Sequence, residues 1–291
     1  MWFAEHWTDY KLIDAAGGEK LEYWKNYLLR RPDPQAVWHV RNEQRLWDKP
    51  DAWYHRSSTG GGGWQFLNPR LPQRWTVRYK NLTFNIKPMG FKHTGLFPEQ
   101  AINWDWFSSL VQKAGRPIRI LNLFAYTGGA TAAALAAGAE VVHVDASKGM
   151  VAWAKENIVS SGLADRPVRF IVDDVVKFVR RERRRGRQYE AVIMDPPSYG
   201  RGPGGEVWKI EDQLFPLVEE CMGLLSDKPL FFLINSYTTG LTASVLTNVL
   251  SLSVARRFGG RVTAGELGLP MTAAPGLYLP CGISGRWEVE V

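Results

Sequence analysis

The sequence predicts an α/β protein, in which a small β-rich domain precedes a doubly wound, mostly parallel sheet. From about Ile102 onward, apolar strand-like runs alternate with helical patterns, which is typical of a doubly wound sheet. Between Tyr10 and about Met89, short strand-like runs are instead separated by Pro and Gly. The 291 residues, 45% of them hydrophobic, are enough for two cores. We therefore expect a β-rich domain over 1–92 and an α/β domain over 93–291.

The first region is predicted to contain short strands and one short helix. The strands are expected at 10–15, within 20–30, at 75–80 and at 82–89, and the helix near 34–40, the segment PQAVWHV. Ten of the 13 tryptophans also occur within the first 106 residues. Such residues either fill the core of a small β-rich domain or stack on unpaired bases of a nucleic acid. The pattern favours the core, with the nucleic-acid surface as the alternative.

The second region is predicted to alternate strands and helices. The strands are expected at 119–124, 140–145, 168–174, 189–195 and 229–236. The helices are expected at 130–138, 148–162, 207–225 and 241–254, and a basic helix is expected after the third strand. Further β segments are expected at 276–280 and 285–291. Ser147 is a suitable N-cap for the helix that follows it. No internal repeat interrupts either region.

Composition narrows the functional classes. A net charge of +7 and a pI near 9.4 favour a polyanionic partner. The basic run KFVRRERRRGRQ at 177–188 is either a solvated helix end, whose cations complement the helix dipole, or an RNA-binding patch. The start of the chain lacks a signal-peptide pattern and no apolar run is long enough to span a membrane, so we expect a cytoplasmic protein. Two cysteines make a disulfide framework or a Cys-rich metal site improbable, and no metal is expected.

Polar or glycine residues follow each predicted strand, at the edge where doubly wound sheets bind ligands. Gly128 and Gly129 follow the first strand and would let a ligand approach the backbone. Asp145 lies 17 residues beyond Gly128, close to the offset of an acid that binds ribose hydroxyls. Asp173 or Asp174, after the third strand, can accept from an exocyclic amine. Together these positions indicate a cofactor that carries adenosine.

The fourth strand ends on Asp195-Pro196-Pro197-Ser198-Tyr199. Two prolines make the backbone rigid where cofactor and substrate would meet. A polar group followed by an aromatic ring can hold a planar substrate in line with an electrophilic methyl group. The segment GRGPGG at 200–205 would form the rim of this pocket.

Residues 93–240 resemble the class I S-adenosylmethionine-dependent methyltransferases, which have a Rossmann-like sheet. They are most similar to the group related to the large-subunit ribosomal RNA methyltransferases, which modify cytosine carbon 5 or guanine nitrogen 7. The resemblance rests on LNLFAYTGG, VDASKGMVAWAKEN, DDVVKFV and DPPSYG, in that order, and on TGLFPEQAINWDW before the first strand. The segment KLEYWKNYLLRRPDPQAVW also resembles the small β-rich domain that precedes the catalytic domain in such proteins.

The resemblance implies a role for each matching residue. The residues implied to bind S-adenosylmethionine are Phe124, Tyr126, Thr127 and Gly128 at the methionine end, Asp145 with Ala146 and Ser147 at the ribose, Asp174 with Val175 at the adenine, Phe97 as a cover and Asp195. The residues implied to shape the reaction pocket are Asp195, Pro196, Pro197, Ser198 and Tyr199, with Tyr199 stacking on a flipped base.

The cysteines bear on the mechanism that the resemblance implies. Methylation at cytosine carbon 5 usually needs a cysteine thiolate, which relatives carry beyond strand four or five. Here those places have DPPSYG and INSYTTG, while Cys221 and Cys281 lie elsewhere. We therefore expect non-covalent methyl transfer to a base of RNA, ribosomal RNA foremost, for instance at a ring nitrogen. The alternatives are a small-molecule or protein acceptor, a dinucleotide-dependent oxidoreductase, and an RNA-binding protein with a degenerate site.

Overall fold

The computed structural model describes residues 1–57, 61–201 and 207–290. Its backbone divides into two compact units, Met1–Ile102 with Leu267–Cys281, and Asn103–Glu266 with Gly282–Val291. The first unit thus contains a segment from near the C-terminus that the sequence alone would assign to the α/β domain. The boundary expected between a domain over 1–92 and a domain over 93–291 stays a prediction.

The first unit is rich in β-structure. It contains a five-stranded sheet and a two-stranded sheet, with one short helix, α1 (Gln44–Trp47). The five strands, in sheet order, are β2 (Tyr10–Ala16), β3 (Glu19–Trp24), β4 (Tyr27–Pro32), β5 (Ala52–Arg56) and β6 (Gly62–Phe66), and the pair is β7 (Trp75–Tyr79) with β8 (Leu82–Ile86). Strand β1 (Trp2–Phe3) and a 3₁₀ turn at Pro98–Gln100 complete it.

The helix predicted near residues 34–40 is wrong. Carbonyl groups of this segment accept hydrogen bonds from the turn between β2 and β3, where Gly17 N donates to Trp38 O at 2.6 Å and Gly18 N donates to Ala36 O at 2.8 Å. These bonds hold the segment extended along the turn, so a helix would lose them. The helix of this region instead begins ten residues later, at Gln44.

The tryptophans of this region fill core positions, as the sequence favoured. None of the ten within the first 106 residues is exposed, and Trp7, Trp24, Trp47, Trp75 and Trp104 are buried. Three of these five donate from their indole N–H group to a buried acceptor, Trp7 to Pro98 O, Trp75 to Trp24 O and Trp47 to Asp14 Oδ2, the last at 2.9 Å. Burial of large aromatic surface stabilises a small β-rich unit that has few helices to pack against.

The second unit contains most of the doubly wound sheet, whose last two strands also include residues of the Leu267–Cys281 segment of the first unit. The strands are β9 (Arg119–Leu123), β10 (Glu140–Asp145), β11 (Val168–Val172), β12 (Ala191–Met194), β15 (Phe231–Ser236), β16 (Arg261–Pro270) and β17 (Tyr278–Glu288). Their order is β16-β17-β15-β12-β9-β10-β11, with β1 beside β16. The neighbours β15, β12, β9, β10 and β11 all pair in parallel, and β17 is antiparallel to β15. The predicted fold class is therefore confirmed.

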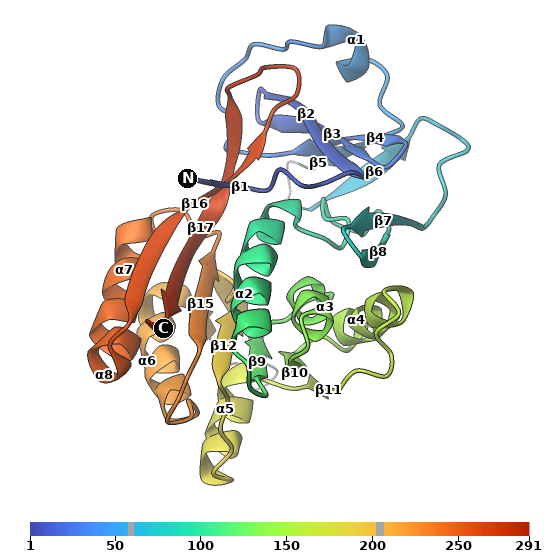
Figure 1. Cartoon of the computed structure of the whole chain (residues 1–291). Helices are drawn as coiled ribbons and strands as arrows, with labels where there is room; N and C mark the ends of the chain where they lie inside the picture. The colour runs from blue at the N-terminus through green and yellow to red at the C-terminus, as the bar shows by residue number, and fades with distance from the viewer. Residues whose placement is uncertain (58–60, 202–206, 291) are drawn as a thin grey trace. The chain divides into compact units, whose positions relative to one another are not determined.

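Helices cover both faces of this sheet (Figure 1). One face carries α2 (Ala101–Lys113), α3 (Gly129–Ala136) and α4 (Lys148–Ser160), and the other carries α5 (Val175–Arg184), α6 (Ile210–Met222) and α7 (Ala243–Leu250), which continues through a π-helical turn at Ser251–Ala255 into α8 (Arg256–Phe258). Successive side chains of a strand point to opposite faces of the sheet, so each strand contributes to a hydrophobic core on either face. Leu121 and Val192 pack with α5, α6 and α7, whereas Phe231 stacks on Phe107 of α2 with centroids 5.7 Å apart.

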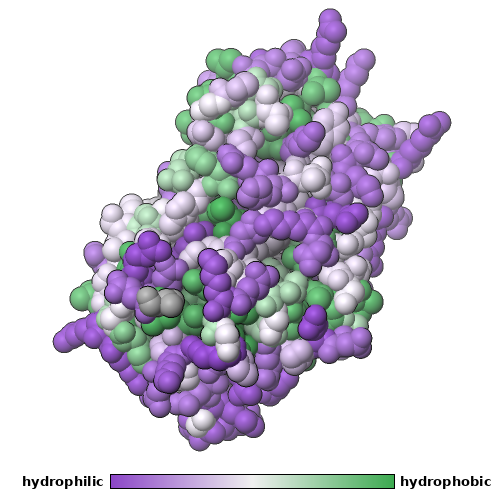
Figure 2. All heavy atoms as spheres, in the orientation of Figure 1, coloured by the Kyte–Doolittle hydropathy of each residue, from purple (hydrophilic) through white to green (hydrophobic). Residues whose placement is uncertain are grey.

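Hydrophilic side chains dominate the face of the molecule that Figure 2 draws, with smaller hydrophobic areas between them. The exposed apolar side chains of the described residues include Phe91 and Leu252. Within those residues, no helix has both the length and the apolar character that crossing a bilayer requires.

Candidate functional site at the carboxyl ends of the strands

The loop after β9 has an unusual backbone. Phe124 and Tyr126 have φ of 54° and 50°, and Gly128 has φ of 81°. Left-handed backbone at a non-glycine residue costs about 1–3 kcal/mol and persists where surrounding contacts impose it. Here Ala125 N donates to Val144 O at 3.0 Å, and Asn157 Nδ2 donates to Thr127 O at 2.8 Å. The loop is thus held in one conformation at the edge where the sequence predicts a ligand.

The two glycines of this loop are required by packing. A Cβ on Gly128 would lie 2.9 Å from Ala154 Cβ of α4, and one on Gly129 would lie 2.7 Å from Trp104 Cζ2 of α2. Neither separation is compatible with a real contact, so any larger residue would displace a helix. Close helix packing therefore accounts for both glycines, and close approach of a ligand stays a prediction.

Asp145, the last residue of β10, connects two loops. Its Oδ2 accepts from Tyr126 N at 2.9 Å and its Oδ1 accepts from Ser147 N at 2.8 Å. The carboxylate is partly exposed, and each oxygen keeps a second lone pair for a further donor. Ser147 accepts from Met150 N at 3.4 Å, which confirms its predicted role as the N-cap of α4, and Ala146 beside it is exposed.

The two aspartates after β11 have different partners. Asp173 forms an ion pair with Arg181, and its backbone N–H donates to Asp145 O at 3.1 Å. Asp174 caps α5, because its Oδ1 accepts from Lys177 N at 2.9 Å. The charge of Asp173 is thus already compensated by an arginine, whereas no ion pair of Asp174 occurs among the described residues and its carboxylate accepts the hydrogen bond of a helix cap. Val175, which follows it, is buried.

The segment after β12 forms a turn and then a hairpin. Ser198 Oγ lies 2.6 Å from Thr238 Oγ1, and Trp208 Nε1 donates to Pro197 O at 2.6 Å. Strands β13 (Tyr199–Arg201) and β14 (Val207–Lys209) pair antiparallel, and residues 202–206, which include most of the predicted rim, lie outside the described residues. Pro196 is buried, and Tyr199 is 51% exposed.

The hairpin also corrects the helix predicted over 207–225, which begins only at Ile210. Val207 and Trp208 belong to a strand because they pair with the residues after Ser198. The Trp208 ring lies 5.4 Å from the Phe124 ring, which connects the hairpin to the loop after β9. The sequence has a pattern for this hairpin, two short β-favouring runs on either side of a glycine-rich segment. Trp208 belongs to the second run, so this pattern could have revealed that it lies in a strand.

The remaining predicted residues lie elsewhere. Phe97 belongs to the first unit, where its ring lies 5.4 Å from the His93 ring. Cys221 is fully buried in α6, and burial raises the pKa of its thiol. Cys281 belongs to the first unit, its Sγ donates to Leu279 O at 3.4 Å, and burial raises its pKa as well. Both thiols are therefore protonated at neutral pH.

His143 is a buried residue close to the loop after β9, because a Cβ on Gly128 would lie 3.6 Å from its Cε1. It is fully buried on β10, and its Nδ1 lies 2.9 Å from Thr131 Oγ1 of α3, which also accepts from Asn122 Nδ2 at 2.9 Å. Among the described residues, no hydrogen-bond partner reaches its Nε2. Burial lowers the pKa of His143 to about 3, so the imidazole is neutral.

This buried histidine is expected to make stability depend on pH. As pH falls below about 6.5, the unfolded chain binds a proton at His143 that the folded chain refuses until about pH 3. The free energy of unfolding should therefore fall by about 1.4 kcal/mol per pH unit from this group between pH 6 and pH 4. Urea unfolding at pH 7, 6, 5 and 4 measures it, and His143→Gln should have a correspondingly shallower slope. Equal slopes for the two proteins would contradict the assignment.

Three comparisons with known proteins bear on this arrangement. The family model for S-adenosylmethionine-dependent methyltransferases matches residues 54–210. A crystal structure of such a methyltransferase from Agrobacterium tumefaciens is 38% identical, with a TM-score of 0.93, and the match covers 99% of this chain and 93% of that one. A protein from Streptococcus mutans, described as a methyltransferase of the same kind, is 18% identical with a TM-score of 0.73, over 97% of this chain and 76% of that one, and shares the fold.

Curated relatives match a smaller part. The ribosomal RNA large subunit methyltransferase K/L of Shewanella baltica (strain OS155) is 30% identical over 168 residues, 57% of this chain and 22% of that protein. The protein of the same name from Shewanella oneidensis is 32% identical over 141 residues, 48% of this chain and 19% of its own length. The chain thus aligns with about a fifth of the length of these relatives.

Proposed function

Because the chain belongs to the family of S-adenosylmethionine-dependent methyltransferases, we propose that it methylates a base of RNA in the cytoplasm, with ribosomal RNA as the acceptor. The observation that carries this proposal is the exposed Tyr199 ring directly after the rigid Asp195-Pro196-Pro197 turn. An exposed aromatic ring at the methyl-transfer position suits a planar base that has left its stack.

The residues at the carboxyl ends of β9 and β10 fit the ribose and methionine ends of the cofactor. Asp145 is immobilised by two backbone donors and still has an acceptor lone pair on each oxygen, which suits the two ribose hydroxyls. Ala146 and Ser147 would flank the ribose. The residues that would line the methionine end are those of the constrained loop, Phe124, Tyr126, Thr127 and Gly128, with Asp195 on the neighbouring strand and Phe97 as the cover.

The adenine end would lie at the start of α5. Asp174 with Val175 would take the exocyclic amine and the ring, since a carboxylate accepts from an amine. Asp173 is the less suitable acceptor because it is already paired with Arg181. This arrangement favours Asp174, the position that the sequence motif also indicates.

When bound, the cofactor supplies an electrophilic methyl group on its sulfonium. The chain therefore has to align the acceptor atom and exclude water rather than create a strong nucleophile. Pro196 and Pro197 would keep the turn rigid, and Ser198 would keep it in place through Thr238. Asp195 would accept a hydrogen bond from the base, and Tyr199 would stack on it.

Two further features support RNA as the acceptor. The net charge of +7 attracts a polyanion over long range. The curated relatives are named as methyltransferases of large-subunit ribosomal RNA, and they align with 57% and 48% of this chain. The positive charge would then attract the same RNA to which the methyl group is transferred.

Methyl transfer is proposed to be non-covalent. The double variant Cys221→Ala/Cys281→Ala is therefore expected to keep at least about half of the turnover number, because neither protonated thiol would attack a base. Turnover is measured with labelled S-adenosylmethionine after circular dichroism has shown that the variant is folded. Complete loss of methyl transfer in a folded variant would overturn the non-covalent mechanism.

The acceptor class is tested by following the label. The protein is incubated with radiolabelled S-adenosylmethionine and ribosomal RNA from a strain that lacks its gene, and the RNA is then digested for nucleoside mass spectrometry. We expect one methylated nucleoside that RNA from the wild-type strain does not acquire. Label found only in protein or small molecules would contradict the RNA assignment.

A further inference from the structure

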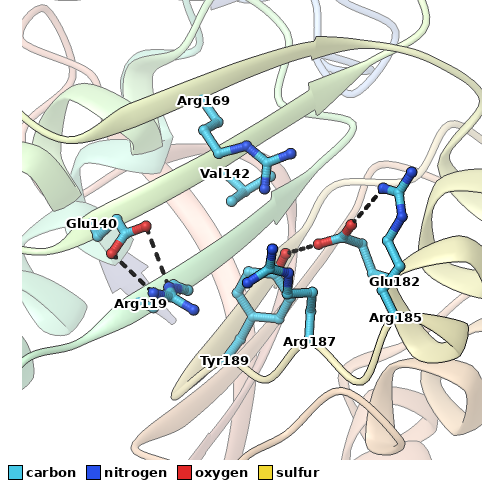
Figure 3. A pocket seen from close by; sticks show the side chains of 8 residues that line it. All are labelled: Arg119, Glu140, Val142, Arg169, Glu182, Arg185, Arg187 and Tyr189. Carbon is cyan, nitrogen blue, oxygen red and sulfur yellow. Dashed lines mark hydrogen bonds and ion pairs between the residues drawn. The ribbon is translucent and has the colours of Figure 1, made fainter.

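The second unit has a polar cavity of about 320 Å³ at the opposite edge of its sheet. Arg119 and Glu140 are the first residues of β9 and β10 and pair in register, and Arg169 pairs with Val142 on the next strand. Because these strands are parallel, the cavity lies at their amino ends, whereas Asp145 lies at their carboxyl ends. Figure 3 shows that the end of α5 and the segment after it form the other wall.

The carboxylates of the cavity already have partners. Glu140 pairs with Arg119 at 3.3 Å, and Glu182 pairs with Arg185 at 3.1 Å. Glu182 is 1% exposed and also accepts from Tyr189 Oη at 2.6 Å. Each acidic group is therefore compensated by one arginine at the wall.

Two more arginines are left without a carboxylate. No ion pair of Arg169 or Arg187 exists among the described residues, and both side chains are exposed. In Figure 3 their guanidinium groups extend from opposite walls toward the same space. The wall thus has four arginines against two glutamates, an excess of two positive charges in one concavity.

This excess of positive charge favours the binding of an anion that has several oxygen atoms. A guanidinium donates two parallel hydrogen bonds to a phosphate, and two guanidinium groups that face one cavity repel each other until an anion lies between them. The basic surface continues along α5, where Arg184 is exposed and has no carboxylate partner among the described residues. A chain of phosphates could therefore follow the helix beyond the cavity.

We propose that the cavity between Arg169 and Arg187 binds a backbone phosphate of the RNA acceptor. This inference rests on the proposed function, and it places an RNA contact at the sheet edge opposite the methyl-transfer site. The basic run at 177–188 is then both a helix end and part of an RNA-binding surface. Since the contact is remote from the reacting atoms, its loss raises the KM for RNA and leaves the turnover number unchanged.

The test compares two charge-matched variants of the full chain. Arg169→Gln/Arg187→Gln removes the two cavity arginines, and Arg166→Gln/Arg256→Gln removes two exposed arginines that belong neither to the cavity nor to the basic run. Affinity for a fluorescent RNA fragment is measured by anisotropy between 50 and 300 mM salt. The cavity variant is expected to bind ~10-fold more weakly, with a salt slope reduced by about one to two. The control should stay within about threefold of the unmodified chain.

Each other result has a defined meaning. Equal weakening of both variants, or none, overturns the proposal, because general charge would then explain RNA binding. In a second arm, titration calorimetry with inorganic phosphate should show binding that Arg169→Gln/Arg187→Gln abolishes. Phosphate binding without any loss of RNA affinity would assign the cavity to a small phosphate ligand and overturn the RNA contact. If RNA acquires no methyl group but the cavity variant still binds it more weakly, the proposed function fails and the phosphate site stands.

Discussion

Asp145→Ala is expected to weaken binding of S-adenosylhomocysteine ~100-fold or more, because two hydrogen bonds to a carboxylate are worth about 1.5–3 kcal/mol each. The substitution also removes the acceptor of Tyr126 N and Ser147 N, which releases the constrained loop after β9. Titration calorimetry measures the dissociation constant directly.

Two controls make this result specific. Asp165→Ala removes an exposed aspartate before β11 and should leave the dissociation constant unchanged. Asp145→Asn keeps one acceptor oxygen and should have an intermediate affinity. Wild-type affinity in a folded Asp145→Ala variant would show that the ribose binds elsewhere.

Asp195→Ala is expected to lower the turnover number ~100-fold to 1,000-fold, because a misplaced acceptor atom is no longer aligned with the methyl group. Affinity for S-adenosylhomocysteine should change less than about fivefold, since Asp145 and the loop after β9 remain. Labelled methyl transfer at saturating RNA measures turnover, and calorimetry measures affinity.

The matched control for this variant is Asp212→Ala, an exposed aspartate in the first turn of α6. It should retain nearly full turnover, because it neighbours the hairpin in sequence without belonging to the turn. A turnover number within threefold of wild type for Asp195→Ala would remove this carboxylate from the reaction.

Much of the second unit was predictable from its sequence because local pattern and tertiary burial agree there. Strand β10 has the bounds that the run EVVHVD predicts, and α4 begins directly after its predicted cap, Ser147. A strand of a parallel sheet is buried on both faces, so its sequence is a nearly continuous apolar run with polar ends. Such a run is easily distinguished from the pattern of an amphipathic helix. The order of the cofactor motifs along the chain then indicates which sheet edge binds the ligand.

The errors arose where pairing with another segment decides the structure. The segment 34–40 contains helix-compatible residues, and its extended form depends on hydrogen bonds from Gly17 and Gly18. Trp208 belongs to a strand only because the segment after Ser198 pairs with it. The contacts of Gly17 and Gly18 override the local preference of segment 34–40, whereas the hairpin of Trp208 has a sequence signal, β-favouring residues on both sides of a glycine-rich segment, that a helix prediction over 207–225 passes over.

The same reasoning applies to the sites. Asp145 was predictable from its place after a strand, but its bond to Tyr126 N required the loop conformation. The basic run was visible as charge alone. Its relation to Arg119 and Arg169 depends on the strand order, which brings three strands beside the basic run at one cavity.

A crystal structure of the full chain with S-adenosylhomocysteine tests the central claim, that the cofactor lies over the carboxyl ends of β9, β10, β11 and β12. The account predicts ribose hydroxyls on both oxygens of Asp145, adenine beside Asp174 and Val175, and the sulfur directed toward Asp195. A ligand bound at the other edge of the sheet, or one whose ribose does not contact Asp145, would contradict it.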